Sequence, residues 1–488
     1  MARFLALRIA LSISAGLPLA ASWAADPPPP APAVDPAVLA RIRDAAMGDD
    51  WAYQRLADLA DKVGPRLSGS PQAEAAVGQV AAALKGAGLK VSLQPVKVPH
   101  WVRGAEEAEL VDYPGRPAGL TQRLHLTTLG GSVATPEDGI TAPVLVVQSF
   151  DELKAHAAEA RGRIVVFDHP FDQFQADNGQ ASTAYLSGYE YRVRGASAAA
   201  RLGAVAALVR SVGGADFRLP HTGVMKYDDD APKIPSAALS AEDAMQVERL
   251  ARQGPVSLHL LLRPQTLPDV DSHNVIADLP GREKPDEVVV VSGHLDSWDL
   301  AQGAIDDGAG VTSAMGAGRL LASLHLPARR TIRVIAWMNE ENGSRGSQAY
   351  FEANKGQIAQ QIAAIESDSG AGQPLGVMVH DTLDSVAALK PVADTLAALG
   401  ANAIERRDHS VGADIEPLEH AGVPGFEPLL DVRRYFHYHH TAADTLDKVE
   451  PDNIRRQVAV LAVLAYYLAE MPEPLPRLPA EVDKPAKP

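Results

Sequence analysis

Residues 287–296 read EVVVVSGHLD, and this stretch decides the fold class. An uninterrupted valine run is typical of a parallel strand that is buried on both faces. The run ends at Gly293 and His294, so an imidazole directly follows a buried strand. In open α/β sheets, ligands bind in the loops at the carboxyl ends of the strands. We therefore expect a sheet covered by helices, with functional residues in the loop that begins at His294.

Strand and helix patterns alternate on the C-terminal side of this run. Residues 308–324 have the pattern of a helix, and residues 331–338 and 362–366 have that of buried strands. A further helix is expected at residues 391–399, with proline in its first turn. This alternation predicts the α/β class, with a mixed, mostly parallel sheet between helices. We assign residues 265–471 to this main domain.

Residues 36–115 are expected to form the N-terminal part of the same domain. Their apolar residues recur at helical spacing as far as residue 86, and Ser70 before Pro71 is a favourable helix start. Residues 89–98 then alternate like a strand. Residues 116–264 contain short apolar strand patterns around an alanine-rich helix pattern at 195–202. We therefore predict a separate α/β insert over residues 116–264.

The two ends of the chain have the composition of segments outside a packed core. Arg3 and Arg8 precede a short apolar run that extends from Ile9 to Ala21. After the run, Ser22 and Ala24 are the small residues expected before a cleavage site that follows Ala24. Residues 1–24 are therefore predicted to be a signal peptide, since the run is too short for a membrane anchor. Residues 25–35 are expected to be a proline-rich spacer, and residues 472–488 a proline-rich disordered tail. The predicted location is periplasmic or secreted, with no membrane anchor after cleavage.

Composition excludes several kinds of site. The chain of 488 residues has no cysteine, so it cannot form thiolate metal sites, cysteine nucleophiles or disulfides. Its length indicates two or three domains. The formal net charge of −16 disfavours nucleic acid or an anionic membrane surface as a partner. Imidazole and carboxylate groups remain as the candidates for metal binding.

Acidic and imidazole residues occur in five segments at expected strand ends or in the loops after them. Each segment alone has an ordinary explanation; two adjacent acids before a helix, for example, can be an N-cap. Together they offer the nitrogen and oxygen ligands of a two-zinc hydrolase. An acid two residues after a histidine can orient it, and one of two adjacent glutamates can bind metal while the other activates water. The segments are His294 to Asp296, Asp306–Asp307, Glu340–Glu341, Asp368 and His437 to His440.

The combined motifs resemble the co-catalytic zinc exopeptidases of metallopeptidase family 28, and within it the carboxypeptidase Q branch, as an exported bacterial member. The resemblance implies the zinc-exopeptidase fold, and it likens the insert to a protease-associated domain. It covers nearly the whole mature chain. The matching segments are residues 64–70, 274–277 with 280–281, 292–299, 303–308, 340–341, 366–368 and 440–445.

The resemblance also implies roles for individual residues. One Zn²⁺ would take His294 and Asp368, the other Glu341 and His440, with Asp306 bridging both. Glu340 would be the general base, and Asp296 the orienting partner of His294. His439 stands where many relatives have the tyrosine that steadies the oxyanion, and we assign it that role. Asp414 and Asp307 are assigned to the substrate side, although Asp307 could instead shape the turn.

The implied reaction is hydrolysis of dipeptides or short peptides with free termini by metal-activated water. Aminopeptidase, carboxypeptidase and dipeptidase action stay open, as does Co²⁺ or Mn²⁺ in place of Zn²⁺. Two other functions remain as alternatives: a glutaminyl cyclase-like acyltransferase with one zinc, and a non-catalytic binding relative. A homodimer is an open alternative, because the sequence does not determine the oligomeric state.

Overall fold

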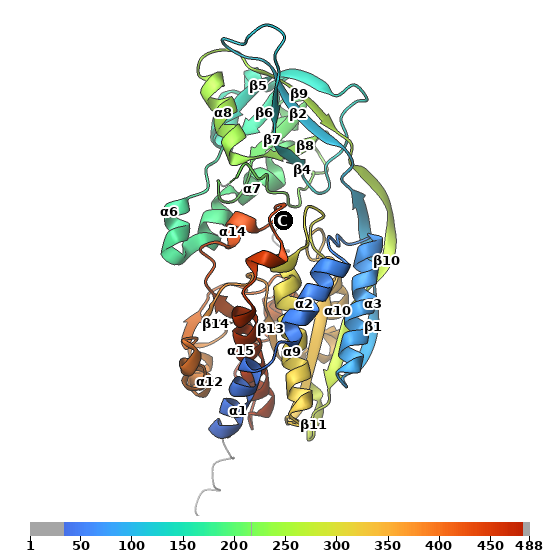
Figure 1. The fold of residues 1–488 in the computed structure, drawn as a ribbon, viewed down its shortest axis with the longest axis vertical. Coiled ribbons are helices and arrows are strands. Elements are labelled where there is room, and N and C mark those ends of the chain that lie inside the picture. Colours follow the sequence, from blue (N-terminus) through green and yellow to red (C-terminus); the bar gives the residue numbers. More distant parts are fainter. Residues whose placement is uncertain (1–33, 216, 482–488) are drawn as a thin grey trace, which may run out of the picture. The chain divides into compact units, whose positions relative to one another are not determined.

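The structure is a computed structural model that describes residues 34–215 and 217–481 (Figure 1). The predicted signal peptide, almost all of the predicted spacer and the last residues of the predicted tail lie outside this range. The described chain contains two eight-stranded sheets. Among the described helices, none combines the length and the apolar character needed to cross a membrane.

The first sheet is mixed, and its centre is parallel. β11 lies between β12 and β13 and runs parallel to both, and β16 is parallel to β13. The remaining pairs are antiparallel except β14 with β15. In spatial order the strands are β1 (Lys90–Val102), β10 (Gln265–Leu279), β12 (Arg330–Trp337), β11 (Lys284–His294), β13 (Gln361–Glu366), β16 (Gly425–Leu430), β14 (Pro374–His380) and β15 (Ala403–Arg406).

The valine run of β11 contributes to two cores, because successive side chains of a strand point to opposite faces. Val289 and Val291 belong to the larger core, and Val288 and Val290 to a smaller one on the other face. The helices on the larger core are α1 (Pro36–Met47), α2 (Trp51–Lys62), α3 (Pro71–Gly86), α9 (Ala309–Ser323), α12 (Lys390–Leu396) and α15 (Pro451–Glu470). On the smaller core lie α10 (Arg345–Asn354) and α13 (Glu416–His420). The predicted sheet with helices on both faces is therefore confirmed.

The second sheet is formed by the insert. Its helices are α4 (Phe150–Ala155), α5 (Ala157–Ala160), α6 (Gln173–Gln175), α7 (Ala181–Arg201) and α8 (Ala241–Ala251). Apolar residues pack on both of its faces in two clusters of their own. Its strands, in spatial order, are β3 (Gln122–Leu124), β2 (Glu106–Asp112), β9 (Ser257–Leu262), β5 (Ile140–Val147), β6 (Ile164–Phe167), β7 (Ala206–Arg210), β8 (Ser236–Leu239) and β4 (Leu126–Thr128).

Two predictions about the insert need correction. Its expected start at residue 116 is too late, because β2 pairs with β9 inside the second sheet. The chain crosses between the two sheets where the Arg263 N–H donates to the carbonyl of Ala105. The helix expected at residues 195–202 is the last part of α7, which begins at Ala181. Tyrosine and arginine residues in its first half obscured the alanine-rich pattern.

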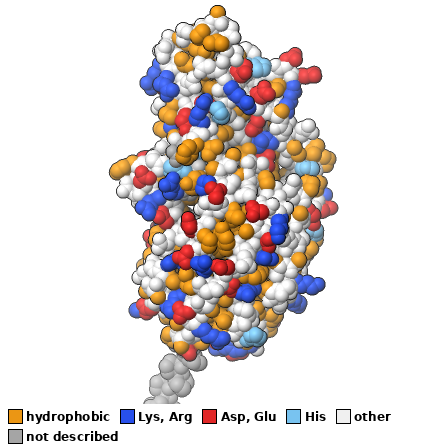
Figure 2. All heavy atoms as spheres, viewed as in Figure 1, with side chains coloured by type: hydrophobic (Ala, Val, Ile, Leu, Met, Phe, Trp, Pro, Cys, Tyr) orange, Lys and Arg blue, Asp and Glu red, His pale blue; other side chains and the backbone are white. Residues whose placement is uncertain are grey.

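The remaining elements are short. They are α11 (Leu383–Ala388) and α14 (Tyr435–Tyr438), with π-helical turns at Ala176–Gln180 and Ala304–Gly308 and 3₁₀ turns at Lys355–Gln360, Ala397–Leu399 and Leu446–Lys448. In Figure 1, α14 lies beside α7 of the insert, and residues of the two helices are in contact. Charged side chains of both signs are interspersed over the face shown in Figure 2.

The prediction of a disordered tail from residue 472 is wrong for residues 472–481. Leu475 is 6% exposed and packs into the larger core. Arg477 donates hydrogen bonds to the carbonyls of Ile358, Ala359 and Gln361. Proline keeps such a segment extended without preventing it from packing. The packed chain therefore continues about ten residues beyond α15.

Candidate metal centre

The carboxyl ends of β11, β12 and β13 bring most of the predicted ligands to one edge of the first sheet. His294 ends β11, the adjacent glutamates follow β12, and Asp368 follows β13. Two further loops complete the cluster: the turn before α9 supplies Asp306, and the segment after α14 supplies His439 and His440. Residues from five separate segments thus converge, as the sequence predicted.

Asp306 lies at the centre of the cluster, between two imidazoles. Its Oδ1 is 3.1 Å from Nε2 of His294, and its Oδ2 is 3.2 Å from Nε2 of His440. Nε2 of His294 is also 3.2 Å from Oδ1 of Asp368, and Nε2 of His440 is 3.1 Å from Oε2 of Glu341. The cluster therefore divides into two groups of donor atoms that share one carboxylate.

Each of these imidazoles is held by its second nitrogen. Nδ1 of His294 lies 2.9 Å from the carbonyl oxygen of Asp296, and Nδ1 of His440 lies 3.2 Å from that of Thr222. A carbonyl can only accept, so Nδ1 donates in both rings and Nε2 is the nitrogen that faces the carboxylates. In both rings Nε2 is therefore the atom placed to bind a metal ion once its proton is lost.

The acid residues of the centre are buried close together. Burial and the neighbouring carboxylates raise the pKa values of Glu340 and Glu341 well above their usual range. Burial likewise raises the pKa of Asp368, although the imidazole of His294 opposes the shift. Burial acts against the charged form of His294, but Asp368 and Asp306 outweigh it and raise its pKa.

The donor atoms of the cluster point to one kind of ligand. So many carboxylates next to two oriented imidazoles form a donor set that suits a divalent cation. Imidazole and carboxylate donors suit Zn²⁺, and the same set also accepts Co²⁺ or Mn²⁺. Among the described residues, two groups have donor atoms within 4.8 Å of one another: His294 with Asp306 and Asp368, and Asp306 with His439 and His440.

Asp296 orients His294 through its main chain and not through its carboxylate. The carboxylate instead accepts the main-chain N–H groups of Asn339, at 2.7 Å, and of Glu340, at 3.1 Å. Asp296 is thus the acceptor for His294, as expected, but the accepting atom is its main-chain oxygen and not its carboxylate. Its carboxylate holds the turn that carries both glutamates.

Asp307 shapes the turn and does not reach the substrate side. It is fully buried, and its two oxygens accept the N–H groups of His294, at 3.0 Å, and Gly310, at 3.0 Å. The Cβ of any larger residue at Gly293 would lie 2.5 Å from Oδ2 of Asp307. This close approach explains the glycine before His294. The structure therefore supports the turn-shaping role of Asp307 and gives no support to direct contact with substrate.

Asp414 is also absent from the residues that line the cavity over the cluster. It is 1% exposed, and its main-chain N–H donates to the carboxylate of Glu366. Burial raises its pKa to about 7. Only its neighbour Ala413 lines the cavity. The structure therefore places Asp414 behind the substrate side and gives no support to direct contact.

His439 and His440 stack on each other, with ring centroids 3.6 Å apart. Nε2 of His439 is 3.5 Å from Oδ2 of Asp306, so this ring also borders the cluster. The rings of Tyr185 and Tyr435 lie against it, at 5.1 and 5.0 Å between centroids. Burial and the nearby imidazole of His440 lower the pKa of His439 well below its usual value. His439 is therefore a neutral imidazole on the cavity wall.

Three supporting residues were not predicted. Asp444 accepts the N–H groups of Ile305 and Asp306, and Thr222 of the insert orients His440. Arg66 is fully buried and donates to the carbonyls of Leu295, Gln302 and Gly303. Arg66 and Asp444 lie in segments that carried the family resemblance, but Thr222 acts through its main chain, so no side-chain signal could have found it.

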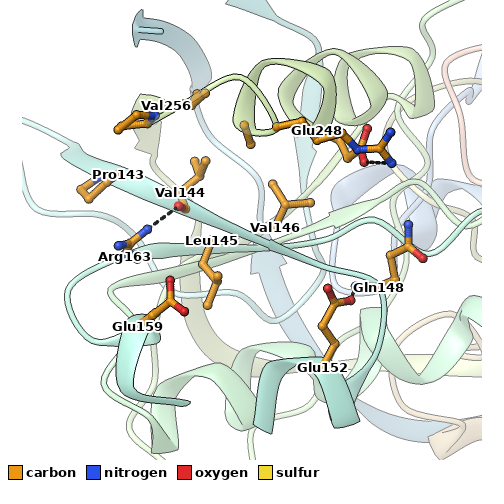
Figure 3. A pocket seen from close by; sticks show the side chains of 14 residues that line it. Pro143, Val144, Leu145, Val146, Gln148, Glu152, Glu159, Arg163, Glu248 and Val256 are labelled. Carbon is orange, nitrogen blue, oxygen red and sulfur yellow. Dashed lines mark hydrogen bonds and ion pairs between the residues drawn. The ribbon is translucent and has the colours of Figure 1, made fainter. Parts of the chain in front are cut away.

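A cavity of about 820 Å³ opens over the cluster. Asp306, Glu340 and Asp368 lie on its peptidase side, and residues of α7, among them Tyr185 and Arg192, lie on its insert side. A second cavity of about 630 Å³ lies on the insert, between β5 and α8 (Figure 3). Glu152, Glu159 and Arg163 border the second cavity, and none of the predicted ligands does. The cavity over the cluster is therefore the candidate substrate site.

Comparisons with known proteins agree with this site. The model of peptidase family M28 matches residues 274–465. Carboxypeptidase Q of Mus musculus is 41% identical over 431 residues, which cover 87% of each chain. The crystal structure of a peptidase M28 precursor from Shewanella amazonensis SB2B has a TM-score of 0.85 at 34% identity and covers 91% of this chain and 99% of its own.

A zinc aminopeptidase from Bacillus subtilis has a TM-score of 0.62 at 20% identity, over 85% of this chain and 94% of its own. At this identity the likeness shows the fold alone. The identity to carboxypeptidase Q is high and extends over most of both chains. The chain therefore belongs to peptidase family M28, in the carboxypeptidase Q branch, and is a metallo-exopeptidase.

Proposed function

We propose that the chain is a two-zinc exopeptidase that hydrolyses dipeptides or short peptides with free termini. The position of Asp306 carries this proposal, because its two oxygens face the two imidazoles of separate donor groups. His294 and Asp368 would hold one Zn²⁺, Glu341 and His440 the other, and Asp306 would bridge them. When bound, the two ions lower the pKa of water towards neutrality and polarise the scissile carbonyl.

Glu340 is the proposed general base. Glu340 lines the cavity, and its main-chain N–H donates to the carboxylate of Asp296. Within the described residues, its own carboxylate has no hydrogen-bond partner and is free to meet a water molecule. A carboxylate in this position accepts a proton from the attacking water and returns it to the amine nitrogen of the leaving group. Burial and the neighbouring carboxylates raise the pKa of Glu340, and a raised pKa favours the protonated acid that makes the second transfer.

His439 remains a candidate to steady the developing oxyanion. Its Nδ1 is buried and has no hydrogen-bond partner within the described residues. Its contact with Asp306 through Nε2 also makes it an alternative ligand to Glu341 in the second group. Nε2 of His440 lies close to both Glu341 and Asp306, and this favours His440 as the ligand.

Three variants test these assignments. Glu340→Gln should retain two zinc ions per chain and lose most turnover, since it removes the proton acceptor and keeps the shape. Glu341→Ala and His440→Ala should lose zinc, measured by elemental analysis after dialysis. Equal zinc content and equal activity in all three variants would refute the assignments. One ion per wild-type chain would instead favour the single-zinc acyltransferase, and none would favour a binding protein.

The terminal preference is tested with a panel of dipeptides. Carboxypeptidase Q relatives suggest carboxypeptidase action, and aminopeptidase relatives such as YwaD of Bacillus subtilis suggest the opposite preference. Free, N-acetylated and C-amidated forms of one dipeptide separate the two. Loss of cleavage on acetylation alone would indicate an aminopeptidase, and loss on amidation alone a carboxypeptidase. A dipeptidase requires both free ends.

The location and the insert are further parts of the proposal. Residues 1–24 have the features of a signal peptide, so we propose export to the periplasm or the medium. The insert is proposed to be a protease-associated-like domain, on the grounds of its strand and helix order and its position over the cavity.

A further inference from the structure

Arg192 is a buried cation of α7 without an acid partner. It is 3% exposed, and its Nε and Nη1 have no hydrogen-bond partner in the described chain. No ion pair to it is found among residues 34–215 and 217–481, although ion pairs are numerous elsewhere. Removing a guanidinium from water without a partner costs several kcal/mol, so such a group is usually completed by an anion.

The side chain of Arg192 lies between two tyrosine rings of its own helix and the main chain of Gly223. Its Cζ lies 5.4 Å from the ring centroid of Tyr185 and 4.9 Å from that of Tyr189. These tyrosines and Arg192 follow one another at helical spacing on one side of α7. Opposite them, Gly223 leaves room for the guanidinium, because a Cβ there would lie 2.5 Å from Cζ. The guanidinium is therefore positioned in advance, with hydrogen-bonding capacity left over.

Arg192 borders the same cavity as the proposed zinc ligands. The ring of Tyr185 contacts both Arg192 and the ring of His439, so only one aromatic ring separates the guanidinium from the cluster. Successive Cα atoms are about 3.8 Å apart, so such a separation corresponds to one or two residues of peptide. Carboxylates dominate the peptidase side of the cavity, whereas Arg192 and the exposed Lys226 are on the insert side.

We propose that Arg192 binds the C-terminal carboxylate of the peptide substrate and so restricts cleavage to the last one or two residues. A guanidinium matches a carboxylate with two parallel hydrogen bonds, which adds orientation to charge attraction. This inference rests on the proposed peptidase function and adds the group that recognises the free terminus. It gives the insert a direct part in substrate choice.

The test compares three substrates in the zinc-loaded enzyme: Ala-Leu, Ala-Leu-amide and Ala-Glu-amide. Wild type should prefer Ala-Leu over both amides in kcat/KM. Arg192→Met should lower kcat/KM for Ala-Leu by about 10–100-fold, the range for a lost charged hydrogen bond, and change the amides by less than about threefold. Arg194→Met is the matched control, because Arg194 is on the same helix and does not line the cavity. The control should keep the wild-type preference.

Binding without turnover separates this inference from the proposed function. In a Glu340→Gln background, calorimetry should show tighter binding of Ala-Leu than of Ala-Leu-amide, and Arg192→Met should abolish the difference. If the wild-type enzyme hydrolyses Ala-Leu but the Glu340→Gln protein shows no binding preference, the role of Arg192 is overturned and the peptidase proposal stands. If the Glu340→Gln protein shows the preference but the wild-type enzyme does not hydrolyse the peptide, Arg192 is supported and the peptidase proposal is refuted.

Two further outcomes decide the matter. Equal use of Ala-Glu-amide and Ala-Leu would overturn the assignment, since it would show that Arg192 serves a side-chain carboxylate. If Arg192→Met fails to fold, as judged by thermal unfolding, Arg192→Lys carries the test. Lysine keeps the charge and loses the bidentate geometry, so the preference for the free carboxylate should fall several-fold but persist. An unchanged preference in Arg192→Lys would contradict bidentate binding.

Discussion

Replacing Asp444 by asparagine should weaken zinc binding without touching a proposed ligand. Asp444 is 5% exposed, and its two oxygens accept the N–H groups of Ile305, at 2.6 Å, and Asp306, at 3.2 Å. Asparagine has nearly the same shape but only one acceptor oxygen. One main-chain N–H would then face an amide N–H₂ group. The turn that presents Asp306 to both donor groups would lose half of its anchor.

The size of the effect follows from these two contacts. A hydrogen bond to a charged acceptor contributes about 1.5–3 kcal/mol, and a buried donor left unpaired adds a desolvation cost. Part of this loss lowers the stability of the folded protein, and part weakens the hold on Asp306 in the position that binds metal. Groups that orient metal ligands typically change metal affinity by about 10–100-fold when they are replaced. We expect a change of this size for Asp444→Asn.

The assay is competition for zinc against a chromophoric chelator, with thermal unfolding of the metal-free proteins as a measure of folding. Asp447→Asn is the matched control, because this neighbouring carboxylate belongs to a side chain that is 70% exposed. The control should bind zinc like wild type. If a folded Asp444→Asn protein also binds zinc like wild type, the anchoring role of Asp444 is refuted.

The remaining predictions concern the stability of the parts around the site. Arg66→Met should lower the free energy of unfolding by about 3–5 kcal/mol, because carbonyls that Arg66 now satisfies would be left unpaired. Urea unfolding measures this, with Arg123→Met as the exposed control. Leu475→Ala should cost about 2–3 kcal/mol by the same assay if the tail packs into the core, and no cost would refute that packing. Burial raises the pKa of Glu427 to about 8, so the folded protein binds a proton there that the unfolded chain releases near its usual value. In metal-free protein, wild type should therefore lose stability as pH rises from 5 to 8, by at most about 1.4 kcal/mol per pH unit, and Glu427→Gln should not. A difference in unfolding free energy between the two proteins that stays constant over that range would contradict the shift.

The fold and the ligand cluster were largely predictable because their signals are local. The valine run of β11, the helix start at Ser70 and the acids after β12 and β13 each lie within a few residues of the element that places them. Strand ends of a parallel sheet meet at one edge whatever the rest of the chain does. The pattern of residues 287–296 therefore predicted both the sheet and the position of the site on it.

The supporting contacts could not be predicted, because they join distant segments and often use the main chain. Residues 222 and 440 are 218 positions apart, and the contact is made by a carbonyl that any residue possesses. Asp296 likewise orients His294 through its carbonyl, so the side-chain chemistry that suggested its role points to a different contact. A sequence reports side chains, and it leaves the direction of a main-chain carbonyl to the tertiary structure.

The role of the insert follows from the same contacts. If the insert were an independent domain, connected to the first sheet only by its two chain crossings, the metal centre would be complete without the insert. Here the insert supplies the carbonyl that holds the ring of His440 through Nδ1, while α7 supplies the unpaired Arg192 and the tyrosine beside His439. The second donor group and the wall of the cavity therefore both depend on the insert. Zinc binding at that group and the choice of substrate should then respond together to changes in the insert, although no residue of the insert is a proposed ligand.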